Sequence, residues 1–254
     1  MRFFDRYVPR YLGRRFHRLH LWERAGELDV PRDVPVVFVM SHASWWDVLV
    51  GYYLARLVVR IESYAPMDEA QLRRYRILTR LGVYSVDRSS VAGMRAFLRY
   101  TIELLTPGRA VWITPQGEIT SAWRRPIVFQ PGVGHLVRRV GRLATVPVAI
   151  VYEFLEEPRP EIFVKFGPAR RFDGARGTPE AITRVLESDL ERELDAVQDA
   201  LIARDFTRFS VMLEGATSVS LVYDRVRALR ARVTGRPDPA RHGAVVSDPR
   251  KRGA

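Results

Sequence analysis

Short apolar runs alternate with helix-like segments along the first two thirds of this chain, and this alternation restricts its fold more than any other feature. Strands that alternate with helices pack as layers in which much of the sheet is parallel. The sequence therefore predicts an α/β fold: a single domain with a mixed, partly parallel sheet flanked by helices. The expected strands are residues 34–39, 58–64, 83–86, 109–114, 146–152 and 162–166, and the expected helices are residues 45–57, 69–81, 91–105 and 133–142.

The last third of the chain has a helical period. Apolar residues recur at steps of three or four from Ile182 to Leu201, and the opposite face is acidic. This pattern is typical of an amphipathic helix that covers a sheet. We expect this helix, and a second, arginine-rich helix over residues 221–233, to pack on the sheet. The patterns divide the chain into a basic aromatic N-terminal segment (1–29), an α/β domain with its helical cover (30–235) and a disordered tail (236–254).

The chain carries a formal net charge of +12, and nearly all of its basic residues are arginines. This balance favours anionic partners such as phospholipid headgroups, phosphorylated substrates or nucleic acid. The chain has no cysteine, and its five histidines lack the spacing of metal ligands. The sequence therefore predicts no disulfide, no thiolate nucleophile and no metal site. No uncharged apolar run approaches the roughly 20 residues that cross a bilayer.

Aromatic residues gather in two places near the N-terminus. Residues 1–24 mix seven arginines with aromatic side chains, a composition that suits a segment lying in the membrane interface. The alternative is an arginine-rich surface helix packed on the domain. A second aromatic cluster follows, and its side chains could either dock to a membrane or pack under the sheet. It consists of Trp45, Trp46, Tyr52 and Tyr53.

His42 and Asp47 are the first candidates for chemistry. They stand five residues apart, directly after the apolar run 36–40, and on a regular helix they would not share a face. They can meet if His42 lies in the turn between strand and helix. Ser44 is a good N-cap residue, and Asp47 three positions later completes a capping box. An imidazole oriented by a carboxylate can act as a general base near neutral pH. The alternative is that Asp47 only caps the helix and that His42 is an ordinary loop residue.

Arg88 is a candidate for anion binding. It follows the expected strand 83–86 and precedes two serines and the start of a helix. Its planar guanidinium matches the geometry of a phosphate. The alternative is a structural ion pair with Asp87 or another acid.

Gln116, Gly117 and Glu118 follow the expected strand 109–114 at a Pro-x-Gly turn. Open α/β sheets bind ligands at this carboxyl edge. Gly117 permits close approach of the backbone, and its two polar neighbours can bond hydroxyls. The alternative is a simple turn with a solvated glutamate.

Four segments in this order resemble the blocks of the glycerolipid acyltransferase family typified by 1-acylglycerol-3-phosphate acyltransferases. The family blocks are His-x-x-x-x-Asp, a Gly-x-x-x-x-Asp-Arg-like block, Phe-Pro-Glu-Gly-Thr-x-Ser, and a Val-Pro-Val block. Each block is a weak signal alone, and four in order are fairly specific over roughly residues 30–155. Their counterparts run from His42 to Asp47, from Gly82 to Arg88, from Thr114 to Ser121 and from Val146 to Ile150.

The resemblance implies transfer of a fatty acyl group from acyl-CoA or acyl carrier protein to a lipid hydroxyl. His42 would take the proton from that hydroxyl, and Asp47 would orient the imidazole. No covalent enzyme intermediate and no cofactor beyond the co-substrate are implied. The partners would be a lysolipid or glycolipid acceptor and a membrane surface, with no nucleic acid, for a peripheral protein on the cytoplasmic face of the membrane. The residues assigned to substrate binding are Ser44, Arg88, Gln116, Gly117, Glu118 and Arg125.

The chain departs from the family pattern in its third block. Gln116 replaces the family glutamate, and Glu118 replaces the usual threonine, a version that resembles a bacterial subgroup of uncertain acceptor. The change leaves open, besides lysophosphatidic acid, another lysolipid or the sugar hydroxyl of a glycolipid or glycosylated pigment. Arg124 and Arg125 would supply the positive charge that many members provide with a lysine further along. Two other functions stay open: a catalytically silent lipid-binding relative, and a basic nucleic-acid-binding module that the charge alone supports.

Overall fold

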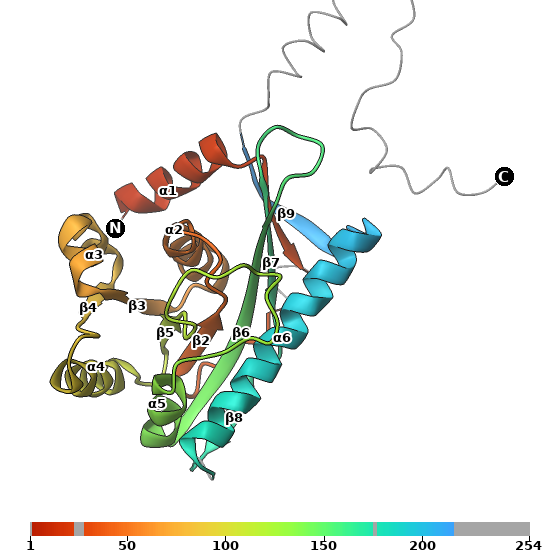
Figure 1. Cartoon of the computed structure of the whole chain (residues 1–254). Coiled ribbons are helices and arrows are strands. Elements are labelled where there is room, and N and C mark those ends of the chain that lie inside the picture. Colours follow the sequence, from red (N-terminus) through yellow and green to blue (C-terminus); the bar gives the residue numbers. More distant parts are fainter. Residues whose placement is uncertain (1, 23–27, 175–176, 216–254) are drawn as a thin grey trace, which may run out of the picture.

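Strand β2 (Val36–Met40) consists of five consecutive buried residues and lies in the middle of the sheet (Figure 1). An unbroken apolar strand is expected where both faces of a sheet are covered. The computed structural model describes residues 2–22, 28–174 and 177–215. Within them, nine strands form one sheet in the order β4-β3-β5-β2-β6-β7-β1-β9, with β8 paired to β6. The other strands are β1 (Arg18–Trp22), β3 (Glu62–Asp68), β4 (Val83–Val86), β5 (Arg109–Ile113), β6 (Arg142–Glu153), β7 (Glu161–Phe166), β8 (Arg170–Asp173) and β9 (Phe209–Glu214).

The half of the sheet around β2 is parallel. Strands β4, β3, β5, β2 and β6 run in one direction. Strands β7 and β8 are antiparallel to β6, while β1 runs parallel to β7 and β9 antiparallel to β1. The predicted fold class, a mixed and partly parallel sheet in a single domain, is confirmed.

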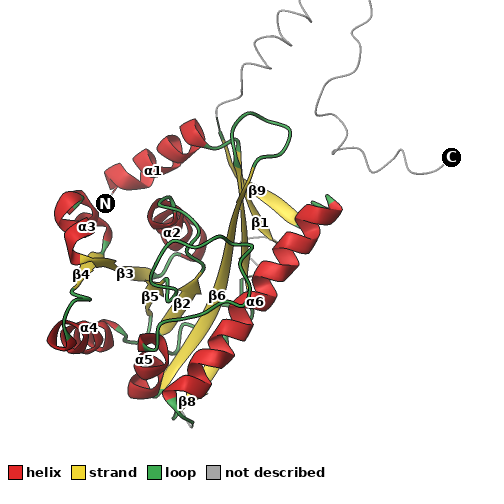
Figure 2. Cartoon of the chain, in the orientation of Figure 1, coloured by secondary structure: helices red, strands yellow, loops and turns green. Residues whose placement is uncertain are grey.

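Helices cover both faces of the sheet (Figure 2). Alternate residues of β2 supply the two cores: Val36 and Phe38 belong to one, and Val37 and Val39 to the other. The first core also contains side chains of α1 (Arg2–Arg15), α2 (Asp47–Tyr53), the π-helical η2 (Leu54–Val59), α3 (Glu69–Arg74) and the 3₁₀ segment η3 (Arg76–Leu81). The second contains side chains of α4 (Val91–Leu104), α5 (Gly132–Val140) and α6 (Pro179–Ala203).

Helix α6 confirms the predicted C-terminal cover. Its apolar stripe packs in the second core, and Thr178 caps its first turn by accepting a hydrogen bond from the N–H of Ala181. The predicted helix over residues 221–233 and the predicted tail 236–254 lie outside the described residues. No helix in the described part of the chain is long and apolar enough to cross a membrane.

The structure corrects three element predictions. Residues 18–22, which the sequence set apart in an N-terminal segment, form β1 within the sheet, between β7 and β9. The strand expected at residues 58–64 is β3 at Glu62–Asp68, because the apolar residues before it extend the preceding helix as η2. A short apolar run does not by itself distinguish strand from helix. The helix expected at residues 69–81 is divided into α3 and η3 at Tyr75.

Candidate active site

The candidate site lies where parallel strands end. His42 follows β2, Arg88 follows β4, and Gln116 and Gly117 follow β5. Because β2 pairs in parallel with β5, the segments after these two strands emerge at the same edge of the sheet. Ligands of open α/β sheets bind outside this carboxyl edge.

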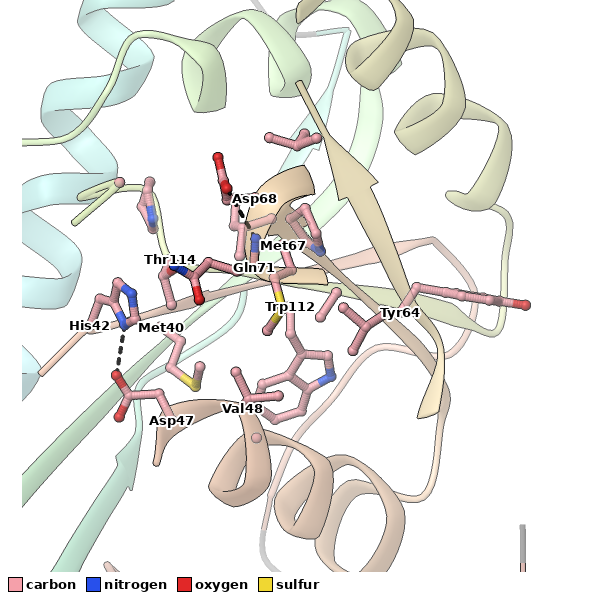
Figure 3. Close-up of a pocket in the computed structure, with 18 of the residues that line it drawn as sticks. Met40, His42, Asp47, Val48, Tyr64, Met67, Asp68, Gln71, Trp112 and Thr114 are labelled. Carbon is pink, nitrogen blue, oxygen red and sulfur yellow. Dashed lines mark hydrogen bonds and ion pairs between the residues drawn. The ribbon is translucent and has the colours of Figure 1, made fainter. Parts of the chain in front are cut away.

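His42 and Asp47 are in contact, as the sequence predicted. Nδ1 of His42 lies 2.8 Å from Oδ2 of Asp47 (Figure 3). Half of the expected capping box forms, because the Ser44 N–H donates to Oδ2 of Asp47 (3.0 Å). The other half does not: Oγ of Ser44 accepts from the Trp46 N–H (3.3 Å), the Asp47 N–H donates to the Ser44 carbonyl (3.2 Å), and the N-cap residue of α2 is Trp46 and not Ser44. The regular helix begins only at Asp47. The Asp47 side chain is 1% exposed and that of His42 is 22% exposed, so the imidazole lies at a border between protein and cavity.

Tyr152, near the end of β6, completes this arrangement. Its hydroxyl donates a 2.6 Å hydrogen bond to Oδ1 of Asp47. Burial, together with the charge of Asp47 and this hydrogen bond, raises the pKa of Tyr152 well above its ordinary value. The tyrosine therefore stays a protonated donor. The sequence placed Tyr152 at the end of a strand but gave no sign of this role.

Arg88 is held by the turn after β5. Its Nη1 donates a 2.5 Å hydrogen bond to the carbonyl of Gly117. Gly117 has a positive φ of 78°, and a Cβ there would lie 3.0 Å from Nη2 of Arg88, so the position favours glycine. The alternative ion pair with Asp87 does not form, since Asp87 accepts hydrogen bonds from Ser89 and Ser90 instead. Among the described residues, no acidic side chain pairs with Arg88.

The other residues assigned to substrate binding lie differently. Gln116 accepts a hydrogen bond from the His42 N–H (2.7 Å) and donates one to Thr120. Glu118 is exposed and does not line the cavity beside His42. Oγ of Ser44 accepts a hydrogen bond from the Trp46 N–H, and Ser44 does not line the cavity. The expectation for Arg125 needs correction: its guanidinium binds side chains of α6 away from the cavity, namely Glu191, Asp195 and Gln198.

A cavity of about 590 Å³ extends from His42. His42, Asp47, Arg88 and Gly117 line it, so the structure brings four of the predicted site residues to one space. Apolar side chains form most of the rest, and Figure 3 shows several of them beside the His42–Asp47 pair. The apolar lining includes Met40, Trp45, Val48, Gly51, Ala55, Met67, Val86, Phe97, Trp112 and Leu136.

Trp112 forms a fixed part of the cavity wall. Its ring stacks on Phe38 at a centroid distance of 4.1 Å, and its Nε1–H donates to Oγ of Ser63. The sequence reading of the 109–114 strand did not assign Trp112 to the site. No group of three or more side chains suited to hold a metal ion occurs in the part of the chain that the structure describes.

Comparisons with known proteins identify the fold and the family. A structure of the 1-acyl-sn-glycerophosphate (LPA) acyltransferase, PlsC, from Thermotoga maritima has the same fold, with a TM-score of 0.55 and 15% sequence identity over 78% of this chain and 79% of that one. No curated protein matches the chain. The model of the family described as Acyltransferase matches residues 23–151, just over half of the chain. The resemblance to glycerolipid acyltransferases found in the sequence is thereby confirmed, and this chain belongs to the Acyltransferase family.

Proposed function

We propose that this protein is an O-acyltransferase that moves a fatty acyl group from acyl-CoA or acyl carrier protein to a hydroxyl of a lysophospholipid or a related lipid or glycolipid. The observation that carries the proposal is the His42–Asp47 pair at the border of a large, mainly apolar cavity. Membership of the Acyltransferase family supports the reaction type.

The geometry supports His42 as the general base. Its Nδ1–H donates to Asp47, which leaves Nε2 of the neutral ring as the proton acceptor. Nε2 takes the proton of the acceptor hydroxyl while the oxygen attacks the thioester carbonyl. The tetrahedral intermediate then expels the thiolate of the donor, which recovers the proton from His42. The Asp47 carboxylate stabilises the charged imidazolium that exists between these steps.

The cavity supports a substrate with an acyl chain. Burial of each methylene in an apolar space contributes about 0.8 kcal/mol, so a lining of this kind favours a long chain over water. Arg88, at the same cavity, uses one N–H on Gly117. A guanidinium carries five N–H donors, and those that remain suit a phosphate or sugar headgroup of the acceptor.

A lipid acceptor implies contact with a membrane surface. The outer face of α1 is aromatic and basic, with Phe3, Arg6, Tyr7 and Arg10 exposed, which suits anionic headgroups. Since acyl-CoA and acyl carrier protein are cytoplasmic donors, the proposed location is the cytoplasmic face, as a peripheral protein.

The proposal is tested with purified protein, a labelled acyl-CoA or acyl carrier protein, and a panel of lysophospholipids and glycolipids. The wild type is expected to form a labelled ester, and His42→Ala should lower the rate by about 10³-fold or more. His135→Ala is the matched control, because His135 is exposed on α5 and does not line the cavity. A normal rate in His42→Ala would refute the assignment of the base. Lysolipid binding without transfer by the wild type would identify a catalytically silent relative.

A further inference from the structure

The contacts of Gln116 give it a different role from the one that its sequence block implies. We infer that Gln116 is a positioning residue: it holds the backbone of the general base His42 and does not bind the acceptor. This inference rests on the proposed acyl transfer for its catalytic meaning. The contacts themselves concern only the turn after β5 and the residue that follows β2.

His42 lies where the chain leaves the sheet. The last regular pairing is next to it, where the Ser41 N–H donates to the carbonyl of Val148 (3.1 Å). Beyond this point the backbone N–H and C=O of His42 need other partners, since partly buried backbone groups rarely stay unpaired. The loop after β5 supplies both of them.

Gln116 and Thr120 satisfy the two backbone groups of His42. Oε1 of Gln116 accepts from the His42 N–H at 2.7 Å, and the Thr120 N–H donates to the His42 carbonyl at 2.8 Å. Nε2 of Gln116 in turn donates to Oγ1 of Thr120. These contacts form a closed ring of hydrogen bonds around His42, and Gln116 takes part in two of them.

The turn that carries Gln116 is itself anchored. The Gly117 N–H donates to the carbonyl of Thr114 (3.1 Å), and the Gln130 N–H donates to that of Pro115 (2.8 Å). Arg88 binds the carbonyl of Gly117 at 2.5 Å. The backbone of His42 is held against this turn, and its imidazole is held by Asp47. His42 therefore has little freedom to shift. A shift of about 1 Å at a catalytic group can cost about 100-fold in rate.

Both polar atoms of the Gln116 side chain are engaged within the protein, each in one hydrogen bond to the segment around His42 or Thr120. Gln116 also does not line the cavity, whereas its neighbour Gly117 does. An acceptor-binding role would require the side chain to reach a cavity that it does not line. The geometry therefore favours positioning over binding.

The variants Gln116→Ala and Gln116→Glu separate the two roles. The alanine variant loses both contacts, so its kcat should fall about 10-fold to 100-fold while KM for the acceptor stays within about two-fold. A glutamate can still accept from the His42 N–H, and the Thr120 hydroxyl can turn to donate to it. Gln116→Glu should therefore recover most of kcat.

Gln198→Ala is the matched control. Gln198 also uses both amide atoms to hold a loop, by donating to the Ala122 carbonyl and accepting from Arg125, but it lies away from the cavity. Its loss should lower stability while kcat and KM stay unchanged. An increase in acceptor KM at constant kcat in Gln116→Ala would overturn the inference and return Gln116 to acceptor binding. Unchanged kinetics in that variant would overturn it as well.

A measurement without substrate keeps this inference separate from the proposed function. With ¹⁵N-labelled histidine, the chain gives five histidine signals, and comparison with His42→Ala identifies that of His42. Gln116→Ala should increase hydrogen exchange at the His42 amide and shift its Nδ1–H resonance, and Gln198→Ala should do neither. Unaltered His42 signals in Gln116→Ala would refute positioning. A wild type that transfers no acyl group would refute the proposed function alone.

Discussion

The carboxylate of Asp47 accepts hydrogen bonds from three donors in the candidate site. The His42 ring and the Ser44 N–H share Oδ2, and the Tyr152 hydroxyl binds Oδ1. The side chain is 1% exposed. A carboxylate fixed in this way is already aimed at the imidazole before substrate binds, and such preorganisation is the main way in which enzymes stabilise developing charge.

The variant Tyr152→Phe tests how much the tyrosine hydroxyl contributes by holding Asp47. It removes one donor from Asp47 and leaves the ring, whose contact with Phe16 at 5.8 Å preserves the packing. A hydrogen bond to a charged group contributes about 1.5–3 kcal/mol, so kcat/KM should fall about 10-fold or more with the fold intact. Steady-state kinetics and a thermal melt measure both effects.

The pH dependence of this effect follows from the direction of the pKa shift. Because the pKa of Tyr152 is raised above its ordinary value near 10, its hydroxyl stays protonated in the folded protein throughout the neutral range. The ratio of wild-type to Tyr152→Phe rates should therefore be constant from about pH 6 to about pH 9. A ratio that declines toward pH 9 would mean that the tyrosine ionises there and does not serve as this donor.

Local spacing explains which site residues the sequence could predict. The contact between His42 and Asp47 is set by one turn, and the capping pattern around Ser44 was enough to predict it. Tyr152 and Gln116 reach the same place from 105 and 74 residues away in the chain. Their partners depend on the strand order, which hydrophobic periodicity does not specify.

At the scale of elements, α2 and η2 form one wall of the cavity. Val48, Gly51 and Ala55 line it at steps of three and four residues, so one helical face supplies them. Two of these side chains are small, which leaves room between the helix and Met40 and Trp112 on the sheet. The space available to a substrate chain is therefore set by residues of α2 and η2.

Gly51 offers a test of the cavity as the site of the acyl chain. A Cβ at this position would lie 3.6 Å from Cε of Met40, an ordinary contact, and alanine stabilises a helix by about 1 kcal/mol relative to glycine. Gly51→Ala should therefore fold well, and Gly51→Leu should fill part of the cavity. We expect Gly51→Leu to lower kcat/KM for a long-chain acyl-CoA about 10-fold more than for a short-chain one.

The control for Gly51→Leu is Ile202→Leu, an exposed position on α6, which should leave the chain-length preference unchanged. Competition between long-chain and short-chain donors in one reaction measures the preference directly. An identical preference in wild type and Gly51→Leu would place the acyl chain elsewhere.

The sequence predicted elements best where a buried run is continuous or a helical period is long. Strand β2 and helix α6 are examples, at Val36–Met40 and Pro179–Ala203. Strands β1, β8 and β9 were missed. Strand β1 contains Arg18 and His20, and it gains its partners from β7 and β9, both remote in the chain. Tertiary pairing of this kind outweighs local β propensity.

For the whole molecule, the placement of α1 agrees with one interpretation of the N-terminal segment, a helix packed on the domain, and membrane docking stays a prediction. Its inner face, with Val8 and Leu12, is buried in the core. Its acidic residue, Asp5, pairs with Tyr52 and Arg56 of the next helical segments. The helix is therefore packed on the domain, and its outer face remains aromatic and basic.

Aromatic side chains connect α1 with the cavity. Tyr7 lies between Phe3 and Tyr11 at centroid distances of 5.7 and 5.6 Å, and Tyr11 contacts Trp46 at 5.6 Å. Trp46 contacts Trp45, which lines the cavity and is 47% exposed. The exposed aromatic side chains of α1 and the cavity thus lie at the two ends of one connected series. A lipid bound at the membrane surface beside α1 would lie near the cavity.

Replacing Arg6 and Arg10 by Gln tests the docking of this face to a membrane. Both arginines are exposed on α1, and each basic residue near an anionic surface contributes about 1 kcal/mol. The double variant should bind vesicles of anionic phospholipid roughly 30-fold more weakly in a sedimentation assay. Activity on a soluble short-chain acceptor should not change.

The matched control is the double replacement of Arg138 and Arg139 by Gln. These arginines are also exposed, but on α5, which covers the other face of the sheet. If vesicle binding reflects only the net charge of +12, both double variants lose the same affinity. If α1 is the docking element, the loss is confined to Arg6 and Arg10. Phe3 is 70% exposed on the same helix. At high salt the attraction to charged headgroups is screened, so replacing Phe3 by Ser should weaken the vesicle binding that remains.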